Sequence, residues 1–177
     1  MDIRVQKTES AIKNAFLELR SQKSVEKITV KELCRKAQIN KSTFYTHYAD
    51  IYALSDAMQA ETIAFVLGTI SRQGEWSVQD PGGFTRAIFQ AVAAHRTLIY
   101  GLFSEHERTR LANALEAGIR EMVYEKYPER RGDEETDILL SYSIQGGYHA
   151  YLNHQEVDEE KLVAVIERIT STLEPLY

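Results

Sequence analysis

The sequence predicts an all-α protein with about eight or nine helices. Among its 177 residues are three Pro and nine Gly, fewer turn formers than a β-rich protein uses. Apolar residues recur at the i, i+3, i+4, i+7 spacing of helices that bury one face. The chain is 44% apolar and 27% charged. This composition suits one or two compact domains and excludes a chain that is disordered throughout.

Three helices are expected within residues 1–49. The first, over 8–23 with Thr8 as its cap, buries a stripe made of Ile12, Ala15, Phe16 and Leu19. Thr29 and Glu32 have the spacing of a capping box, which opens a second, short helix. Asn40 caps a third helix over about 41–47, only about two turns long. The turn between them has Gln38 at a position that needs a positive φ, for which Gln is not ideal.

Two short helices joined by a tight turn have the layout of a helix-turn-helix. On the third helix, Lys41, Ser42, Tyr45 and Thr46 share one face, and Phe44 and Tyr48 lie on the opposite side. A polar face of Lys, Ser, Thr and Tyr suits the major groove of DNA, where hydroxyls and Lys meet base edges and Tyr reaches a phosphate. The alternative is a small helical bundle with an ordinary solvated face.

Charge is distributed unevenly along the chain. Residues 1–54 hold ten Lys/Arg and six Asp/Glu, a net charge of +4, whereas residues 55–177 carry the remaining net charge of −9. This asymmetry favours an N-terminal module that faces a polyanion, attached to a body that need not touch it. Chance is the alternative explanation.

The remaining helices are predicted from caps and stripes. Asp50 caps a fourth helix, Asp80 followed by Pro81 opens a fifth, and a further helix over 107–126 ends before Pro128. Two long helices follow, over about 133–153 and 158–173. We therefore expect a helix-turn-helix DNA-binding domain over 1–49 and a helical effector-binding and dimerisation domain over 50–177.

Residues 28–48, ITVKELCRKAQINKSTFYTHY, resemble the DNA-binding signature of TetR-family transcriptional regulators. That pattern runs T-V-x-x-I-A-x-x-A-G-V-S-x-G-T-hydrophobic-Y-x-Y/H-F, and the resemblance spans about residues 8–54. It implies an all-helical, homodimeric, sequence-specific DNA-binding regulator, most often a repressor. In such a protein a small-molecule effector in the C-terminal body modulates binding to a near-palindromic operator.

The resemblance also implies roles for individual residues. Thr29 and Lys31 open the helix that rests on the DNA backbone, and the third helix meets bases and phosphates. With the polar face described above, the expected DNA-binding residues are Thr29, Lys31, Lys41, Ser42, Thr43, Tyr45, Thr46 and His47. Ala49 and Ile51 stand where family members often place Lys, which predicts fewer phosphate contacts and a shallower dependence on salt.

Small residues within the helix over 139–151 predict a close approach to another helix, because each helical Gly otherwise costs about 1 kcal/mol. The resemblance implies that this helix and the last one form a four-helix bundle across a two-fold axis. The expected dimer interface comprises Ser143, Gly146, Gly147, Ala150, Tyr151, Leu162, Val165, Ile166 and Ile169. The alternative is that these faces meet only within one chain.

Aromatic and apolar residues on inward stripes of the body define a working effector pocket. They are Phe65, Phe89, Phe103, Ile119, Met122 and Tyr142. For any single one of them, a place in the core or in an interface is the alternative.

Several classes of protein are excluded or disfavoured. Cys34 is the only cysteine, which excludes an intrachain disulfide and favours a reducing compartment; we expect Cys34 to be a buried small residue. No apolar stretch approaches the roughly 18 residues of a membrane span, so a cytoplasmic protein is expected. The sequence has no catalytic motif, and we expect no enzyme activity, metal or cofactor. The alternatives are a co-activator whose body binds a protein partner, and a helical adaptor that binds no DNA.

Overall fold

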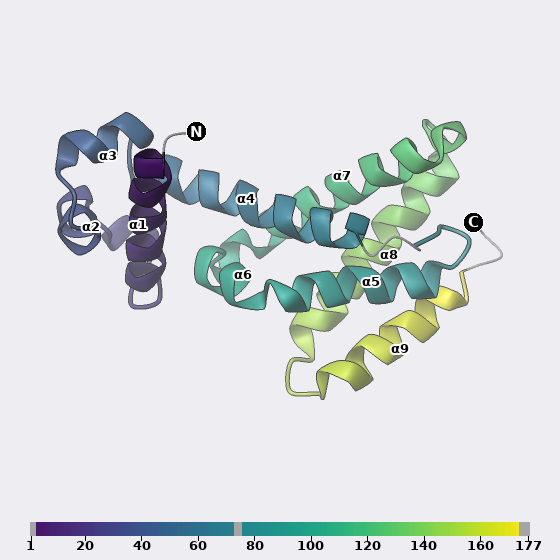
Figure 1. Ribbon diagram of the computed structural model, residues 1–177. Helices are drawn as coiled ribbons and strands as arrows, with labels where there is room; N and C mark the ends of the chain where they lie inside the picture. Colours follow the sequence, from purple (N-terminus) through teal and green to yellow (C-terminus); the bar gives the residue numbers. More distant parts are fainter. Residues whose placement is uncertain (1–2, 73–75, 174–177) are drawn as a thin grey trace. The chain divides into compact units, whose positions relative to one another are not determined.

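The computed structural model describes residues 3–72 and 76–173, which contain nine α-helices, three short 3-10 helices and no strand (Figure 1). The predicted all-α class is confirmed. The α-helices are α1 (Ile3–Arg20), α2 (Val30–Ala37), α3 (Lys41–His47), α4 (Ile51–Arg72), α5 (Pro81–Ala94), α6 (Arg96–Leu102), α7 (Arg108–Lys126), α8 (Glu134–Asn153) and α9 (Glu159–Ser171). No helix in the described ranges combines the length and apolarity needed to cross a membrane.

Most predicted helix starts are confirmed by their caps. The side chains of Thr29, Asn40, Asp80, Asp133 and Asp158 each accept a hydrogen bond from a backbone N–H in the first turn of the helix that follows. The prediction that Thr8 caps the first helix is wrong. That helix begins at Ile3, and the Thr8 hydroxyl donates to the carbonyl of Arg4 at 2.9 Å inside it.

The chain divides into two compact units. The first, the head, runs to Thr62 and also takes in Thr97–His106. Its core contains fully buried side chains from four helices: Ile12, Phe16, Leu33, Phe44 and Leu54. The Gln59 side chain donates to the carbonyl of Leu102 at 3.0 Å, which attaches the end of α6 to α4 within this unit. This compact unit reaches beyond residue 49, and the division into a DNA-binding domain over 1–49 and an effector-binding domain over 50–177 stays a prediction.

The second unit, the body, comprises Ile63–Arg96 and the chain from Glu107 onward. Helices α5 and α9 lie side by side in it (Figure 1). Gly82 at the start of α5 makes this approach possible, because a Cβ there would lie 2.0 Å from Ser171 Oγ of α9. Buried Phe89, Ile119 and Leu140 come from three different helices of this unit.

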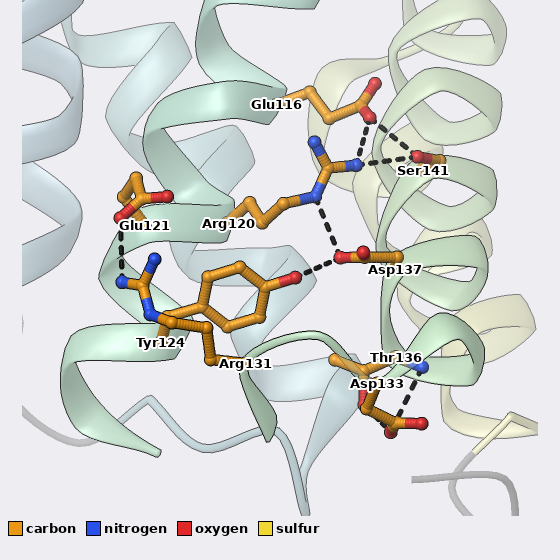
Figure 2. Close-up of polar contacts among 9 residues, drawn as sticks. All are labelled: Glu116, Arg120, Glu121, Tyr124, Arg131, Asp133, Thr136, Asp137 and Ser141. Atoms are coloured by element: carbon orange, nitrogen blue, oxygen red, sulfur yellow. Dashed lines mark hydrogen bonds and ion pairs between the residues drawn. The ribbon is translucent and has the colours of Figure 1, made fainter. Parts of the chain in front are cut away.

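A polar network joins α7 to α8 on the partly exposed side of the body (Figure 2). The carboxylate of Glu116 accepts hydrogen bonds from Arg120 at 2.7 Å and from Ser141 at 2.6 Å. Arg120 Nε lies 3.1 Å from Asp137 Oδ1, and the Tyr124 hydroxyl donates to the same carboxylate. Asp137 and Ser141 are one turn apart on α8, so the network fixes the register of the two helices.

Candidate nucleic-acid interface

Helix α2 begins with the capping box that the sequence predicts. The Glu32 backbone N–H donates to the Thr29 hydroxyl at 3.2 Å. The Glu32 carboxylate lies 2.5 Å from Lys23 Nζ, and this hydrogen bond lowers the pKa of Glu32, with the Thr29 backbone N–H as a smaller contributor. Thr29 and Lys31 are exposed at the start of α2, as the contacts with a DNA backbone that the resemblance implies would require.

The turn between α2 and α3 depends on Gln38. Its φ of 56° and ψ of 41° place it in the left-handed region, and no other described residue except a glycine has a positive φ. The Ile39 N–H donates to the carbonyl of Cys34 at 3.0 Å and closes the end of α2. The expectation that this position needs a positive φ is confirmed, although the residue is not the Gly that would adopt it without strain.

Asn40 organises the start of α3. Its side-chain oxygen accepts three hydrogen bonds, from the Thr43 N–H at 2.7 Å, the Ser42 hydroxyl at 2.6 Å and the Thr43 hydroxyl at 2.8 Å. A short helix of seven residues gains much of its definition from such a cap, because too few internal hydrogen bonds are available to form it alone.

The two sides of α3 differ sharply. Phe44 is fully buried in the head, while the neighbouring Tyr45 is 55% exposed. Lys41, Ser42 and Thr46 are exposed with Tyr45, as the helical spacing predicts. Thr43 and His47 are half-buried at the edges of this face. An exposed polar face on a helix of this length, anchored by one buried ring, has the shape of a groove-reading element.

The lysines and arginines of the head differ in whether a carboxylate holds them. Three lysines are held by carboxylates: Lys13 by Glu9 and Glu61 at 2.6 Å each, Lys23 by Glu32, and Lys36 by Glu18 at 2.5 Å. Burial acts to lower the pKa of Lys13, but the hydrogen bonds to Glu61 and Glu9 outweigh it and raise that pKa. In contrast, Lys31, Arg35 and Lys41 are exposed and make no ion pair with any residue that the structure describes.

Sequence reasoning missed Arg35 as a member of this group. It lies four residues after Lys31, so the two side chains share one face of α2. That spacing was the available signal. Phosphate neutralisation needs cations that are not already committed to protein carboxylates, a condition that Lys31, Arg35 and Lys41 meet.

Cys34 contributes no chemistry to this surface. It is 4% exposed, and burial raises the pKa of its thiol, so the reactive thiolate is disfavoured. Across the described ranges, no group of three or more His, Cys, Asp or Glu side chains is placed to hold a metal ion.

The body contains a mostly apolar cavity between α5, α7 and α8. Of the six residues predicted for the effector pocket, Phe89 and Ile119 line it. The other four do not: Phe65 and Tyr142 are 51% and 66% exposed, Met122 is half-buried elsewhere on α7, and Phe103 is buried in the head. Phe84, Thr85 and Tyr148 line the cavity and were missed.

The residues predicted for the dimer interface are also divided by the structure. Gly147, Tyr151, Leu162 and Ile166 are buried within one chain, and a Cβ on Gly147 would lie 3.3 Å from Ile166 Cγ2. These four side chains pack against neighbours of their own chain, and their place in a dimer interface stays a prediction. Ser143 and Ala150 are half-buried, while Gly146, Val165 and Ile169 are exposed.

Two large apolar residues of α8, Ile138 and Tyr142, are 67% and 66% exposed. They stand four residues apart and therefore share a face, and Gly146 continues it one turn further on. No side chain or backbone would meet a Cβ built on Gly146 within 4 Å. Sequence reasoning missed Ile138 and placed Tyr142 in the pocket.

The described geometry defines an all-helical protein with a helix-turn-helix head and a larger helical body. This fold is similar to that of a TetR transcriptional regulator from Rhodococcus sp. RHA1. The two structures share a TM-score of 0.51 and 17% sequence identity, over 99% of this chain and 98% of the other. No protein-family model and no curated protein sequence matches the chain. The chain therefore has a TetR-like fold, in agreement with the resemblance of residues 28–48.

Proposed function

We propose that the protein is a sequence-specific DNA-binding transcriptional regulator. The observation that carries this proposal is the exposed face of α3, where Lys41, Ser42, Tyr45 and Thr46 stand together on a helix anchored by buried Phe44. Its small hydroxyls and its lysine suit base edges in the major groove, and Tyr45 suits a phosphate. The uncommitted cations of α2, Lys31 and Arg35, supply backbone contacts.

The regulator acts as a dimer of identical chains. A single two-turn recognition helix reads too few base pairs to locate an operator, so two heads about 34–36 Å apart are needed. The exposed apolar face made by Ile138 and Tyr142 on α8, together with exposed Val165 and Ile169 on α9, is the surface that a second copy covers. Gly146 on the same face lets the partner's backbone approach closely.

An effector in the cavity of the body modulates DNA binding. A molecule that favours a spacing of the heads unable to span two half-sites lowers operator affinity, typically by 1–3 kcal/mol of coupling. With this sign of coupling the protein leaves its operator when the effector binds, and the resemblance to the TetR family favours a repressor.

Selection of bound duplexes from a random DNA library tests the proposal, with the mass of the protein determined on the same sample. We expect enrichment of a near-palindromic sequence by a dimer at near-physiological salt. The variant Lys41→Ala should change which sequence is preferred, whereas Tyr45→Phe should weaken binding to all sequences alike. A well-folded dimer that enriches no sequence would contradict the proposal and direct the search to a protein partner.

A further inference from the structure

The cavity of the body is enclosed by apolar side chains. Phe84 and Phe89 come from α5, Leu115 and Ile119 from α7, and Leu140 from α8. All five are at most 5% exposed. An apolar enclosure with few polar groups is the usual construction of a small-molecule site in a protein.

The polar groups on the cavity wall are hydroxyls. Thr85, Ser143 and Tyr148 line it, and none of its lining residues within 3–72 and 76–173 is Asp, Glu, Lys, Arg or His. Thr85 is 7% exposed, and the other two lining residues, Ser143 and Tyr148, already take part in other interactions within the described part of the chain. A hydroxyl on an apolar cavity wall is stabilised when it acquires a hydrogen-bond partner. Thr85 is therefore the polar anchor that the wall offers to a guest.

Lys126 contacts a ring that stacks on the cavity wall, and its charge is already committed. The Trp76 ring stacks on Phe84 with their centroids 4.6 Å apart. Lys126 Nζ lies 4.3 Å from the centroid of the Trp76 ring, on the side where it also donates to the Trp76 carbonyl. Its charge is satisfied outside the cavity wall, so it offers no counter-charge to an anionic guest.

The cavity is almost closed. Its volume of about 30 Å³ holds only one or two water molecules, far less than the roughly 300 Å³ of a typical ligand pocket. A guest must therefore part α5 from α7 and α8 as it enters. Such a guest has to gain its binding energy from apolar contact, because a charged group would lose its hydration without compensation.

From this construction we infer that the effector is a neutral, largely apolar molecule with one hydrogen-bonding group, such as an alcohol or a phenol, and that the Thr85 hydroxyl binds that group. This inference rests on the proposed function and specifies the chemical class of the effector. Anionic metabolites, nucleotides and metal ions are disfavoured in this cavity, since none of the described side chains that line it carries a charge to compensate theirs.

Titration of the full-length protein with 1-octanol and with octanoate tests the inference. Trp76 is the only tryptophan and stacks on the cavity wall, so its fluorescence reports occupation. We expect a saturable change with 1-octanol at one molecule per chain, and binding at least ten-fold weaker for octanoate, which has the same chain with a charged end. Equal binding of the two would overturn the inference.

Ala112→Leu and Thr85→Val test where the molecule binds. Ala112→Leu fills the cavity from α7 and should abolish the change, while Ala117→Leu, at an exposed position on the same helix, should not alter it. Thr85→Val keeps the shape and removes the hydroxyl, so 1-octanol should bind about three- to ten-fold more weakly. Thr85→Val tests the site even if Ala112→Leu fails to fold. If its affinity for 1-octanol is unchanged, the Thr85 hydroxyl does not bind the ligand.

The titration needs no DNA, so its outcome is separable from the fate of the proposed function. If the protein binds its operator but gives no fluorescence change with 1-octanol, the ligand class alone is rejected. A signal from a protein that enriches no DNA sequence would reject the regulator and leave the ligand class standing.

Discussion

The Ser42 hydroxyl donates a hydrogen bond to the Asn40 side-chain oxygen over 2.6 Å. The same oxygen accepts from the backbone and the hydroxyl of Thr43. Two hydroxyls that we propose as DNA contacts are thus held at the cap of α3 in the free protein. A Ser or Thr hydroxyl rotates freely about its C–O bond and keeps acceptor capacity while it donates. Both residues can therefore accept a hydrogen bond from a base without breaking the cap.

Replacement of Asn40 by Asp separates capping from DNA binding. Asp caps a helix about as well as Asn, so the free energy of unfolding should change by less than about 0.5 kcal/mol. The added negative charge lies beside the proposed phosphate-facing surface and should weaken binding to every DNA sequence, by about ten-fold or more at low salt. Denaturant unfolding and fluorescence anisotropy with the selected duplex measure the two effects.

Asn40→Ala provides the complementary control. It removes the cap without adding charge and should lower the stability of the head by about 1 kcal/mol. If Asn40→Asp bound DNA as tightly as the unaltered protein, the start of α3 would not face DNA.

A matched pair of cations on α2 tests the distinction between committed and uncommitted charges. Arg35 makes no ion pair with a described residue, whereas Lys36 lies 2.5 Å from Glu18. Arg35→Ala should weaken DNA binding and reduce the slope of log K against log salt by about one. Lys36→Ala should leave the slope nearly unchanged, because the lysine it removes is already neutralised. Equal slopes for the two variants would contradict the assignment.

Local features of the fold could be predicted from sequence because their causes are local. The caps at Thr29, Asn40, Asp80, Asp133 and Asp158 each act within three residues of the helix they open. The start of the first helix was missed because nothing in the sequence marks it. Thr8 has the chemistry of a cap, yet inside a helix its hydroxyl instead donates to the carbonyl four residues back.

Contacts between distant segments could not be predicted in the same way. Two adjacent glycines illustrate why helical spacing alone does not predict such contacts. Gly147 is buried against Phe89 and Ile166, whereas Gly146 is exposed. The packing of α5 and α9 decides between them, and no spacing within α8 encodes it. Phe103 similarly joins the head because the chain returns there over Thr97–His106, which an apolar stripe alone does not indicate.

The strained turn offers a stabilising substitution. Gln38 adopts a left-handed conformation that costs about 1 kcal/mol for a residue with a Cβ. Gln38→Gly should therefore raise the free energy of unfolding by about 0.5–1 kcal/mol. Gln38→Ala keeps the Cβ and should leave it unchanged. Thermal unfolding of both variants measures the difference, and equal stabilities would show that the turn stores no such strain.

The dimer surface is tested at its exposed apolar residues. Ile169 on α9 is 54% exposed, so Ile169→Glu should preserve the fold of each chain while placing a charge in the interface. Light scattering should then give the mass of one chain, and specific DNA binding should be lost with it. Val5→Glu, at an exposed apolar position of α1 that is 42% exposed, is the control and should remain dimeric. A dimeric Ile169→Glu protein would move the interface elsewhere.

Glu116 gives the stability of the body a defined pH dependence. Burial would raise the pKa of its carboxyl, but hydrogen bonds from Ser141, Gln145 and Arg120 outweigh burial and lower it. Figure 2 shows the contacts of Glu116 with Ser141 and Arg120. Because the folded pKa lies below the value of 4.5 for the unfolded chain, the stabilisation is complete above that pH. It is lost as the pH falls through the folded pKa.

Glu116→Gln should lower the free energy of unfolding at pH 7 by about 1–2 kcal/mol, since the amide keeps the size but loses the charge that Arg120 and Ser141 share. The difference from the unaltered protein should shrink as the pH falls below about 4.5, because the unfolded chain then binds a proton at this glutamate before the folded protein does. Glu121→Gln is the matched control on the same helix (Figure 2). Its carboxylate is 59% exposed and lies 2.9 Å from Arg131, so it should cost less than about 1 kcal/mol. Urea unfolding at pH 7, 5 and 3.5 measures both, and a constant cost for Glu116→Gln across this range would refute the coupling.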